Sequence, residues 1–222
     1  MCNRFRGVKD WSLLPRQLAQ TRLNFEYNPN VAPTEQVPVL LGERDQPVST
    51  RMARFGIVSK SAPDKRRPPL LNVRTDTLRK GSFKSMLANR HCIIPAEGFY
   101  EWREEDGKKQ PYIFERKDGG PLMLAGIWEW SDVKGDRVPS FAILTDEPNE
   151  LIAPYQDRMP VAVKDPEAWL DPRTSLDDAE PLDTGDYKVR PVNMAVNKVG
   201  TKDIDSIEAE SVASNEDLFA KR

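Results

Sequence analysis

Histidine and cysteine are scarce in this chain of 222 residues: His91 is the only histidine, and Cys2 and Cys92 are the only cysteines. Two cysteines cannot build a disulfide framework, and three such side chains fall short of the four ligands of a structural zinc site. We therefore expect no metal and no other cofactor. His91 opens a β run and is expected to be a packed histidine. A Cys–His peptidase dyad is disfavoured, because Cys92 points to the opposite strand face from His91.

Long apolar runs and several catalytic motifs are also missing. No window reaches the roughly 18 consecutive apolar residues that span a bilayer, and the first residues, MCNRFRGVKD, lack the apolar segment of a signal peptide. We expect a cytoplasmic protein with no membrane contact. The absence of GxxxxGK[ST], HExxH, GxSxG and GxGxxG motifs disfavours nucleotide hydrolysis, zinc proteolysis, α/β-hydrolase chemistry and dinucleotide redox chemistry.

The net charge of −2 conceals an uneven distribution along the chain. Residues 1–111 contain 20 Lys and Arg against 12 Asp and Glu, whereas residues 112–222 contain 13 against 23. The basic half can face a polyanion through phosphate contacts. A solvated surface with two oppositely charged lobes explains the same counts.

The 19 prolines and 12 glycines leave little room for long helices. The pattern predicts one α+β domain over residues 1–200, with a mixed, largely antiparallel, barrel-like β core and short peripheral helices, followed by an acidic, weakly packed tail over residues 201–222. A Pro-Ala-Glu-Gly turn is expected at 95–98. Strands are expected at 37–41, 54–58, 91–95, 99–103, 112–115, 122–128, 140–144, 160–163 and 188–192, and helices at 11–21, 82–89, 147–153, 167–171 and 176–178.

Cys2 has the most unusual placement in the chain. Removal of an initiator methionine before a small residue would make Cys2 a 1,2-aminothiol. An α-amine with a pKa of about 7.7–8.0 condenses with an aldehyde, and the thiol then closes on the imine carbon to form a thiazolidine. The closure is intramolecular and gains from effective molarities on the order of 10⁵ M or more. The alternative is a small residue that is merely tolerated at this position.

Glu101 lies between two large aromatic residues, Tyr100 and Trp102. If it points inward, poor solvation raises its pKa, and the carboxyl can transfer a proton near neutral pH. Plain strand alternation gives the opposite arrangement, with both aromatic side chains inward and Glu101 in water.

Two further segments carry candidate polar side chains. Asn72 and Arg74 project from one face of a short extended segment and suit sugar or phosphate oxygens. Turn capping and a surface ion pair between Arg74 and Asp76 explain them equally well. Arg158 follows Asp157, and an ordinary ion pair between these neighbours is favoured over direct catalysis.

Nine segments occur in a characteristic order: CNRF at 2–5, NVAPTEQVPVL at 30–40, FGIVSK at 55–60, NVRTDT at 72–77, RHCIIPAEGFYEW at 90–102, KKQPYIF at 108–114, LAGIWE at 124–129, ILTDEPN at 143–149 and QDRMPVAV at 156–163. Together they resemble the SOS-response-associated peptidase (SRAP) family, the abasic-site processing proteins. The resemblance covers about residues 2–200.

The resemblance implies a protein that binds single-stranded DNA and captures an abasic site. It makes Cys2 the nucleophile that forms a thiazolidine crosslink with the ring-opened sugar after removal of Met1. It implies that Asn72 positions the sugar, that Glu101 manages protons, and that Arg4 and Arg74 hold flanking phosphates. The family's peptidase label refers to release of its own N-terminal methionine.

The chain departs from the family pattern at several positions. Gln156 replaces the histidine before Asp-Arg, and glutamine has no proton to exchange near pH 7. General acid–base assistance is worth about 10²–10⁴ in rate, so crosslinking or its reversal should be slower. Phe55 replaces a tryptophan and can still act as a base-stacking platform. Asp76 and Val73 replace glutamate and alanine, and Arg158 is counted with the DNA-binding residues.

Two other functions stay open on the sequence alone. A non-covalent single-stranded DNA binding module with decayed chemistry is favoured by Gln156. A cysteine-type peptidase acting on other proteins is disfavoured because it lacks a plausible histidine partner. We expect a monomer whose partner is single-stranded DNA containing abasic sites.

Overall fold

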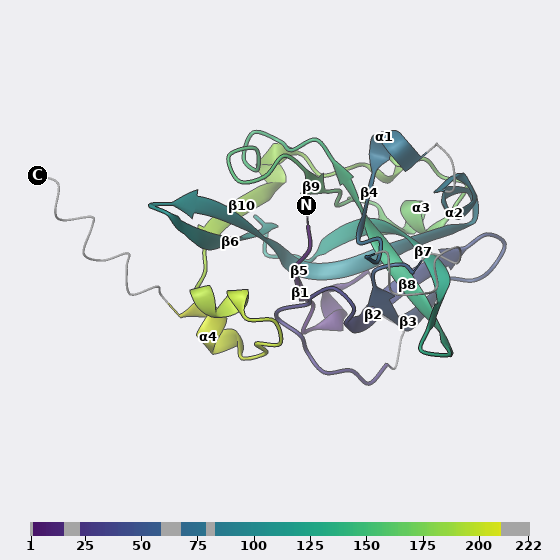
Figure 1. Ribbon diagram of the computed structural model, residues 1–222. Coiled ribbons are helices and arrows are strands. Elements are labelled where there is room, and N and C mark those ends of the chain that lie inside the picture. Colours follow the sequence, from purple (N-terminus) through teal and green to yellow (C-terminus); the bar gives the residue numbers. More distant parts are fainter. Residues whose placement is uncertain (1, 16–22, 59–67, 79–82, 210–222) are drawn as a thin grey trace, which may run out of the picture.

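The computed structural model describes residues 2–15, 23–58, 68–78 and 83–209, and its strands form one hydrogen-bonded sheet (Figure 1). The strands are β1 (Phe5–Gly7), β2 (Gln36–Glu43), β3 (Ser49–Phe55), β4 (Asn72–Arg74), β5 (Arg90–Glu105), β6 (Lys108–Arg116), β7 (Leu122–Val133), β8 (Asp136–Asp146), β9 (Met159–Pro160) and β10 (Tyr187–Pro191). The α-helices are α1 (Thr75–Leu78), α2 (Phe83–Asn89), α3 (Pro166–Leu170) and α4 (Ile204–Glu208). Within the described residues, no helix has the length and apolar character needed to cross a membrane.

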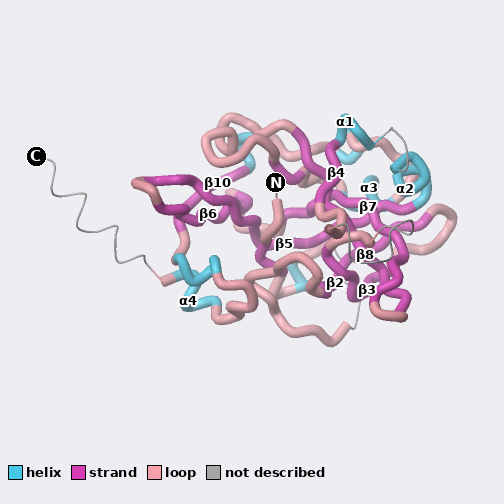
Figure 2. Tube along the Cα trace, in the orientation of Figure 1, coloured by secondary structure: helices cyan, strands magenta, loops and turns pink. Residues whose placement is uncertain are grey.

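The sheet closes on itself as a ring. The hydrogen-bonding order runs β5, β2, β3, β8, β7 and back to β5. Among the described strands, only the β3–β8 and β4–β8 pairs are parallel. Strands β6 and β10 extend from β5 at one end of the molecule, whereas α1, α2 and α3 lie at the other end (Figures 1 and 2). The prediction of a single α+β domain with a largely antiparallel core is confirmed, and the sheet is ring-like.

Strand β5 is the longest strand of the ring and continues without interruption for 16 residues. Its first half pairs with β2 and β7, and its second half pairs with β1 and β6. The expected turn at residues 95–98 is therefore wrong, because Pro95 and Gly98 lie where a continuous strand changes partners. A Cβ on Gly98 would lie 2.6 Å from the carbonyl oxygen of Phe114, so the missing side chain lets β6 approach.

The two faces of the ring have separate cores. Side chains on the enclosed face form a cluster that includes Val39 and Leu41 of β2, Cys92 and Ile94 of β5, and Phe141 of β8. Alternate residues such as Leu40 and Ile93 face outward and pack against Trp169 and Leu170 of α3. This alternation is the period of two that a strand imposes, with both faces covered.

The short helices confirm part of the helix prediction. Helices α2 and α3 lie at the expected places, and a 3₁₀ turn at Asp177–Ala179 overlaps the expected helix at 176–178. The helix expected at 147–153 is wrong: residues 147–149 have no regular structure and residues 150–155 form turns. The Asn149 side chain accepts hydrogen bonds from the backbone of Leu151 and Ile152, which competes with a helix. The expected helix at 11–21 is a 3₁₀ helix at Trp11–Leu13, and residues 16–21 lie outside the described residues.

Part of the predicted tail packs on the domain. Helix α4 buries Ile207 completely in a small cluster with Tyr100 and Ile113. The carboxylate of Glu208 forms ion pairs with Arg6 and Arg190. The prediction of a weakly packed segment is therefore wrong for residues 204–208, while residues 210–222 lie outside the described residues.

The contact between β2 and α3 generates a stability prediction. A Cβ on Gly42 would lie 1.9 Å from the backbone carbonyl oxygen of Leu170, and backbone cannot move aside as a flexible side chain can. We expect Gly42→Ala to lower the free energy of unfolding by about 3 kcal/mol or more. That corresponds to a Tm about 6–12 °C lower for a domain of this size.

The matched control for Gly42→Ala is Gly185→Ala, because no atom lies within 4 Å of a Cβ at Gly185. The control should change stability by no more than about 0.5 kcal/mol. Thermal denaturation followed by circular dichroism measures both variants. Equal Tm values for the two would contradict the close approach of β2 and α3.

Candidate functional site

The N-terminal strand brings Cys2 to the middle of the molecule. Strand β1 pairs antiparallel with β5, with Phe5 opposite Phe99, and the Tyr100 N–H donates to the Arg4 carbonyl at 3.0 Å. Residues 2–4 therefore run beside the second half of β5 (Figure 1). The Cys2 side chain is fully buried in the enclosed core, and its Sγ donates to the Arg4 carbonyl at 3.9 Å.

Arg4 fastens this strand to two other parts of the chain. Its Nε and Nη2 donate to Asn30 Oδ1 at 3.0 and 2.5 Å, and Nη2 also donates to the Val196 carbonyl at 2.5 Å. Asn30 Nδ2 donates to the same Val196 carbonyl at 3.1 Å. Burial lowers the pKa of Arg4 from its ordinary value. The prediction that Arg4 holds a flanking phosphate is therefore corrected, because its guanidinium faces protein oxygens and only 8% of the residue is exposed.

Asn72 lies next to the N-terminal segment. It begins β4, which pairs in parallel with β8 and sets Asn72 beside Ile143. Its Nδ2 donates to Asn3 Oδ1 at 2.9 Å. The buried Oδ1 of Asn72 has no hydrogen-bond partner among the described residues. A buried amide oxygen without a hydrogen bond destabilises the fold, unless a ligand or a water molecule donates a hydrogen bond to it.

Glu101 is the acid of the site. It is only 3% exposed, and burial raises the pKa of its carboxyl to about 7. Gln156 Nε2 donates to Glu101 Oε2 at 3.3 Å. The alternation that would place Glu101 in water is wrong, because both faces of β5 are covered here. Burial raises the pKa of the Cys2 thiol, and the nearby negative charge of Glu101 raises it further.

Arg158 and Thr145 add two more unsatisfied polar groups. Arg158 Nη2 donates to the Thr145 carbonyl at 2.9 Å, while Arg158 Nε and Thr145 Oγ1 are buried without a partner among the described residues. No ion pair between Arg158 and Asp157 occurs in the described part of the chain, so the prediction of an ion pair between these neighbours is wrong. Thr145 was missed by sequence reasoning, because a threonine at the end of a strand carries no distinguishing signal.

These orphan atoms gather on one side of the sheet. The β4–β8 register sets Asn72 beside Ile143 and Arg74 beside Thr145, so their side chains leave the same face. Strand β9 continues that surface by pairing Pro160 with Thr145, two residues after Arg158. An amide oxygen, a hydroxyl and a guanidinium N–H thus border the face that carries Ile143 of the enclosed core. Such a set suits a ligand rich in oxygen atoms.

Arg74 and Phe55 do not take the positions expected of DNA-binding residues. Arg74 is exposed and forms a two-pronged ion pair with Asp76, at 3.0 Å from Nε and 2.6 Å from Nη2. The surface ion pair is therefore confirmed. Phe55 is fully buried, with its ring 5.2 Å from Phe141 in a stacked arrangement and 5.6 Å from the edge-on Phe5. The stacking platform is corrected, because Phe55 has no exposed face for a base.

His91 has a structural role in the packing of β5 against α3. The His91 ring stacks on Trp169 at 3.8 Å, and its two nitrogens lie 2.7 Å from the carbonyl oxygens of Trp169 and Leu87. The prediction of a packed histidine is confirmed. Within residues 2–15, 23–58, 68–78 and 83–209, no group of three or more His, Cys, Asp or Glu side chains is arranged to hold a metal ion.

The arrangement combines a sulfur, an acid that titrates near neutrality and several unsatisfied hydrogen-bonding groups. The acid can donate or accept a proton at physiological pH, since its pKa lies near 7. The free Oδ1 of Asn72 can accept a hydrogen bond from a ligand hydroxyl, while its Nδ2 donates to Asn3. These properties are typical of a reactive site built around Cys2.

Comparison with known proteins gives a consistent result. The family model described as SOS response associated peptidase (SRAP) matches residues 1–199. The protein named abasic site processing protein YoqW of Bacillus subtilis is 30% identical, over 94% of this chain and 100% of its own length. The abasic site processing protein YedK of Escherichia coli is 29% identical, over 94% of this chain and 99% of its own.

A solved structure from Bordetella bronchiseptica has the same fold. It superposes with a TM-score of 0.70 at 22% identity, over 87% of this chain and 100% of that one. At this identity the likeness concerns the fold alone, and it agrees with the family match. By its family model, its relatives and its ring-like α+β fold, the chain belongs to the SOS response associated peptidase (SRAP) family.

Proposed function

We propose that this protein processes abasic sites in single-stranded DNA by forming a covalent bond through Cys2. The observation that carries the proposal is the burial of Cys2 beside Glu101, a carboxyl whose pKa is about 7. The names of the relatives point in the same direction, since YoqW and YedK are both named abasic site processing proteins. Removal of Met1 would free the Cys2 amine, which is otherwise a peptide nitrogen.

The reaction follows from the chemistry of an aminothiol and an aldehyde. The Cys2 amine attacks the aldehyde carbon of the ring-opened sugar and forms a C–N bond. Protonated Glu101 gives its proton to the resulting hydroxyl, which leaves as water and produces an iminium. The Cys2 thiol then loses its proton to ionised Glu101, and its sulfur adds to the same carbon. The product is a thiazolidine, and one water is released overall.

Glu101 suits both proton transfers because its pKa of about 7 keeps both forms populated near neutrality. The raised pKa of the Cys2 thiol keeps the sulfur protonated until the iminium has formed. The amine is therefore the first nucleophile, and the thiol needs Glu101 as its base. Asn72 holds the opened sugar through its free Oδ1, while Thr145 and Arg158 serve sugar or phosphate oxygens.

A non-covalent single-stranded DNA binding function is the second candidate, and one contact favours it. Gln156 reaches Glu101 Oε2 at 3.3 Å but cannot exchange a proton, so the site lacks a second acid–base group at this point. Under this candidate, affinity for DNA depends on salt but does not depend on an abasic site.

We expect Cys2→Ala to abolish the stable adduct. Wild-type protein lacking Met1 should give a heat-stable, slower-migrating species with a single-stranded oligonucleotide that contains an abasic site. Cys2→Ala keeps an amine but has no sulfur, so it should form only an imine that borohydride traps. Gel electrophoresis and intact-mass spectrometry measure both the adduct and the removal of Met1.

The control for this experiment is Cys92→Ala, since Cys92 is a buried core residue of β5 and should leave the adduct unchanged. A heat-stable adduct in Cys2→Ala would overturn the role of the thiol. DNA binding by wild type without any adduct, after confirmed loss of Met1, would favour the non-covalent candidate.

The pH dependence of crosslinking tests Glu101. The rate should rise as the Cys2 amine loses its proton, at a pKa of about 7.7–8.0. It should fall as Glu101 ionises above pH 7, because its pKa is about 7 and the acid form is then depleted. The profile is therefore a bell with its maximum between the two values. Glu101→Gln should lower the rate by about 10²–10⁴ and remove the falling limb.

A stability measurement checks the same pKa independently of activity. The folded pKa of Glu101, about 7, exceeds the ordinary value of 4.5, so its contribution to stability is complete at low pH and is lost as pH rises to about 7. Thermal melts of wild type should therefore show a pH dependence that Glu101→Gln reduces. If Glu101→Gln kept the falling limb of the pH–rate profile and the pH dependence of the Tm of the wild type, the assignment of this pKa to Glu101 would be refuted.

Gln156→His should change the rate of crosslink formation or release several-fold. The replaced side chain lies within hydrogen-bonding distance of Glu101, so an imidazole there adds a group that titrates near neutral pH. Single-turnover kinetics on the abasic oligonucleotide measure the effect, with Gln156→Leu as a control that occupies space without hydrogen bonding. Rates equal in all three proteins would mean that position 156 takes no part in the reaction.

A further inference from the structure

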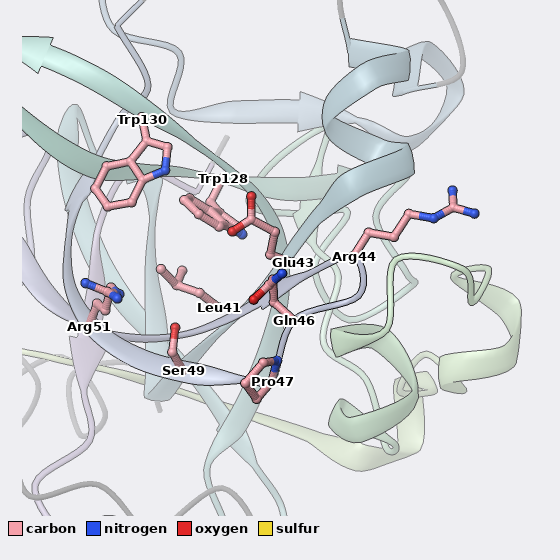
Figure 3. A pocket seen from close by; sticks show the side chains of 9 residues that line it. All are labelled: Leu41, Glu43, Arg44, Gln46, Pro47, Ser49, Arg51, Trp128 and Trp130. Atoms are coloured by element: carbon pink, nitrogen blue, oxygen red, sulfur yellow. The ribbon is translucent and has the colours of Figure 1, made fainter.

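Two adjacent hollows lie beside the β2–β3 hairpin, away from Cys2. Their volumes are about 400 and 580 Å³, and both are lined by Ser49, Arg51 and Trp130. Figure 3 shows the first of them, with the indole of Trp130 on one side and Arg51 across from it. Neither hollow is lined by Asn72 or Glu101, so the two are separate from the Cys2 site.

Trp130 is held in a fixed place at the wall between the hollows. It belongs to β7 and pairs with Pro139 of β8. Its ring meets Trp128 edge-on, at 5.7 Å and 75°. Trp128 is itself buried and donates from Nε1 to the Gly42 carbonyl at 2.9 Å. Trp130 is only half-buried, so a rigid indole is presented to solvent without the entropy cost of ordering a mobile side chain.

Two arginines beside this indole have no carboxylate partner among the described residues. The Cζ of Arg137 lies 5.1 Å from the centre of the Trp130 ring, and Arg51 is exposed across the hollow. Asp or Glu carboxylates pair with several other arginines, namely Arg74, Arg90, Arg116, Arg173 and Arg190. Arg51 and Arg137 differ from these five because both flank an aromatic ring without a carboxylate partner among the described residues.

Glu43 sets the direction in which an anion can lie. Its carboxylate lines the first hollow and pairs with Arg90 at 3.2 Å. A phosphate would be repelled from that side, whereas Arg51 and Arg137 attract it on the side of the second hollow. A planar ring over Trp130 with its phosphate toward these two arginines satisfies both constraints.

We propose that the Trp130 surface, formed by Ser49, Arg51, Trp130 and Arg137, binds one nucleotide of a single-stranded nucleic acid by stacking its base on the indole and holding its phosphate with the two arginines. Aromatic stacking tolerates every base, and guanidinium groups bind phosphate oxygens. The surface gives the protein a second grip on a strand whose abasic site lies at Cys2, and to that extent the inference rests on the proposed function.

The positions on β8 indicate the length of a stacked strand that reaches both sites. Pro139, the partner of Trp130, precedes Thr145 by six residues on β8, which spans about 20 Å at about 3.3 Å per residue. A strand stacked as in a duplex advances about 3.4 Å per nucleotide, so roughly six stacked nucleotides connect the two places.

The experiment measures binding of intact oligonucleotides without an abasic site, using the full chain with Cys2→Ala so that no crosslink forms. Trp130→Ala should weaken binding of a strand of about twelve nucleotides by about 5- to 150-fold. Trp130→Phe should restore most of the affinity, because a phenyl ring still stacks. Fluorescence anisotropy of labelled DNA gives the affinities, and thermal melts confirm that each variant is folded.

Arg51→Gln tests the phosphate contact on a variant that leaves the core untouched. Each lost contact to a single strand should reduce the slope of log K against log salt by about 0.7. The matched control is Arg173→Gln, whose arginine is exposed but paired with Asp171 at 2.8 Å, and it should leave the slope unchanged. Unchanged affinity in Trp130→Ala together with an unchanged slope in Arg51→Gln would overturn the proposal.

A mononucleotide arm distinguishes the source of the nucleotide. If deoxyadenosine monophosphate alone binds as tightly as the long strand and Trp130→Ala abolishes it, the surface takes a free nucleotide and the strand proposal is overturned. Failure of the proposed function is separable: wild type without any adduct rejects crosslinking, whereas a Trp130-dependent loss of intact-strand binding still supports this surface.

Discussion

The pairing of β1 with the second half of β5 is the constraint on which the site depends. It is a short ladder, with Phe5 opposite Phe99 and the Tyr100 N–H on the Arg4 carbonyl. Three residues of strand would hold a free N-terminal segment weakly. The buried guanidinium of Arg4 compensates by joining the segment to Asn30 and to the Val196 carbonyl. Cys2 is thereby held in the core of the ring, near Glu101, which lies on β5.

Burial has opposite uses for the two reactive groups. Withdrawal from water raises the pKa of Glu101 into the physiological range, which makes the carboxyl useful as both donor and acceptor. The same withdrawal raises the pKa of the Cys2 thiol and weakens it as a free nucleophile. An order of events in which the amine attacks first resolves this conflict, because the thiol then needs to react only with a carbon already activated and only after Glu101 has become a base.

The sequence predicted the class of the fold and the identity of the family better than it predicted exposure. Alternation could not decide the side on which Glu101 lies, because β5 is covered on both faces and carries buried residues at consecutive positions. Arg4 and Phe55 were expected to contact DNA from their residue types and family positions. Their burial arises from partners distant in sequence, namely Val196 for Arg4 and Phe141 for Phe55. Such long-range contacts leave no local pattern. The segment at 95–98 shows the same limit, since proline and glycine normally indicate a turn but here accommodate a change of strand partners.

The distribution of charge acquires a physical meaning only when ion pairs are considered. The excess of basic residues in the first half of the chain suggested a surface for a polyanion. However, Arg4 is buried inside the fold, and Arg74 forms an ion pair with Asp76. Net charge counts every cation equally, whereas a phosphate competes for each one against the carboxylate already bound to it. Arg51 and Arg137 face no such competitor among the described residues, and both flank an aromatic ring. Affinity for a strand is therefore expected to depend on a few unpaired arginines rather than on the total number of basic residues.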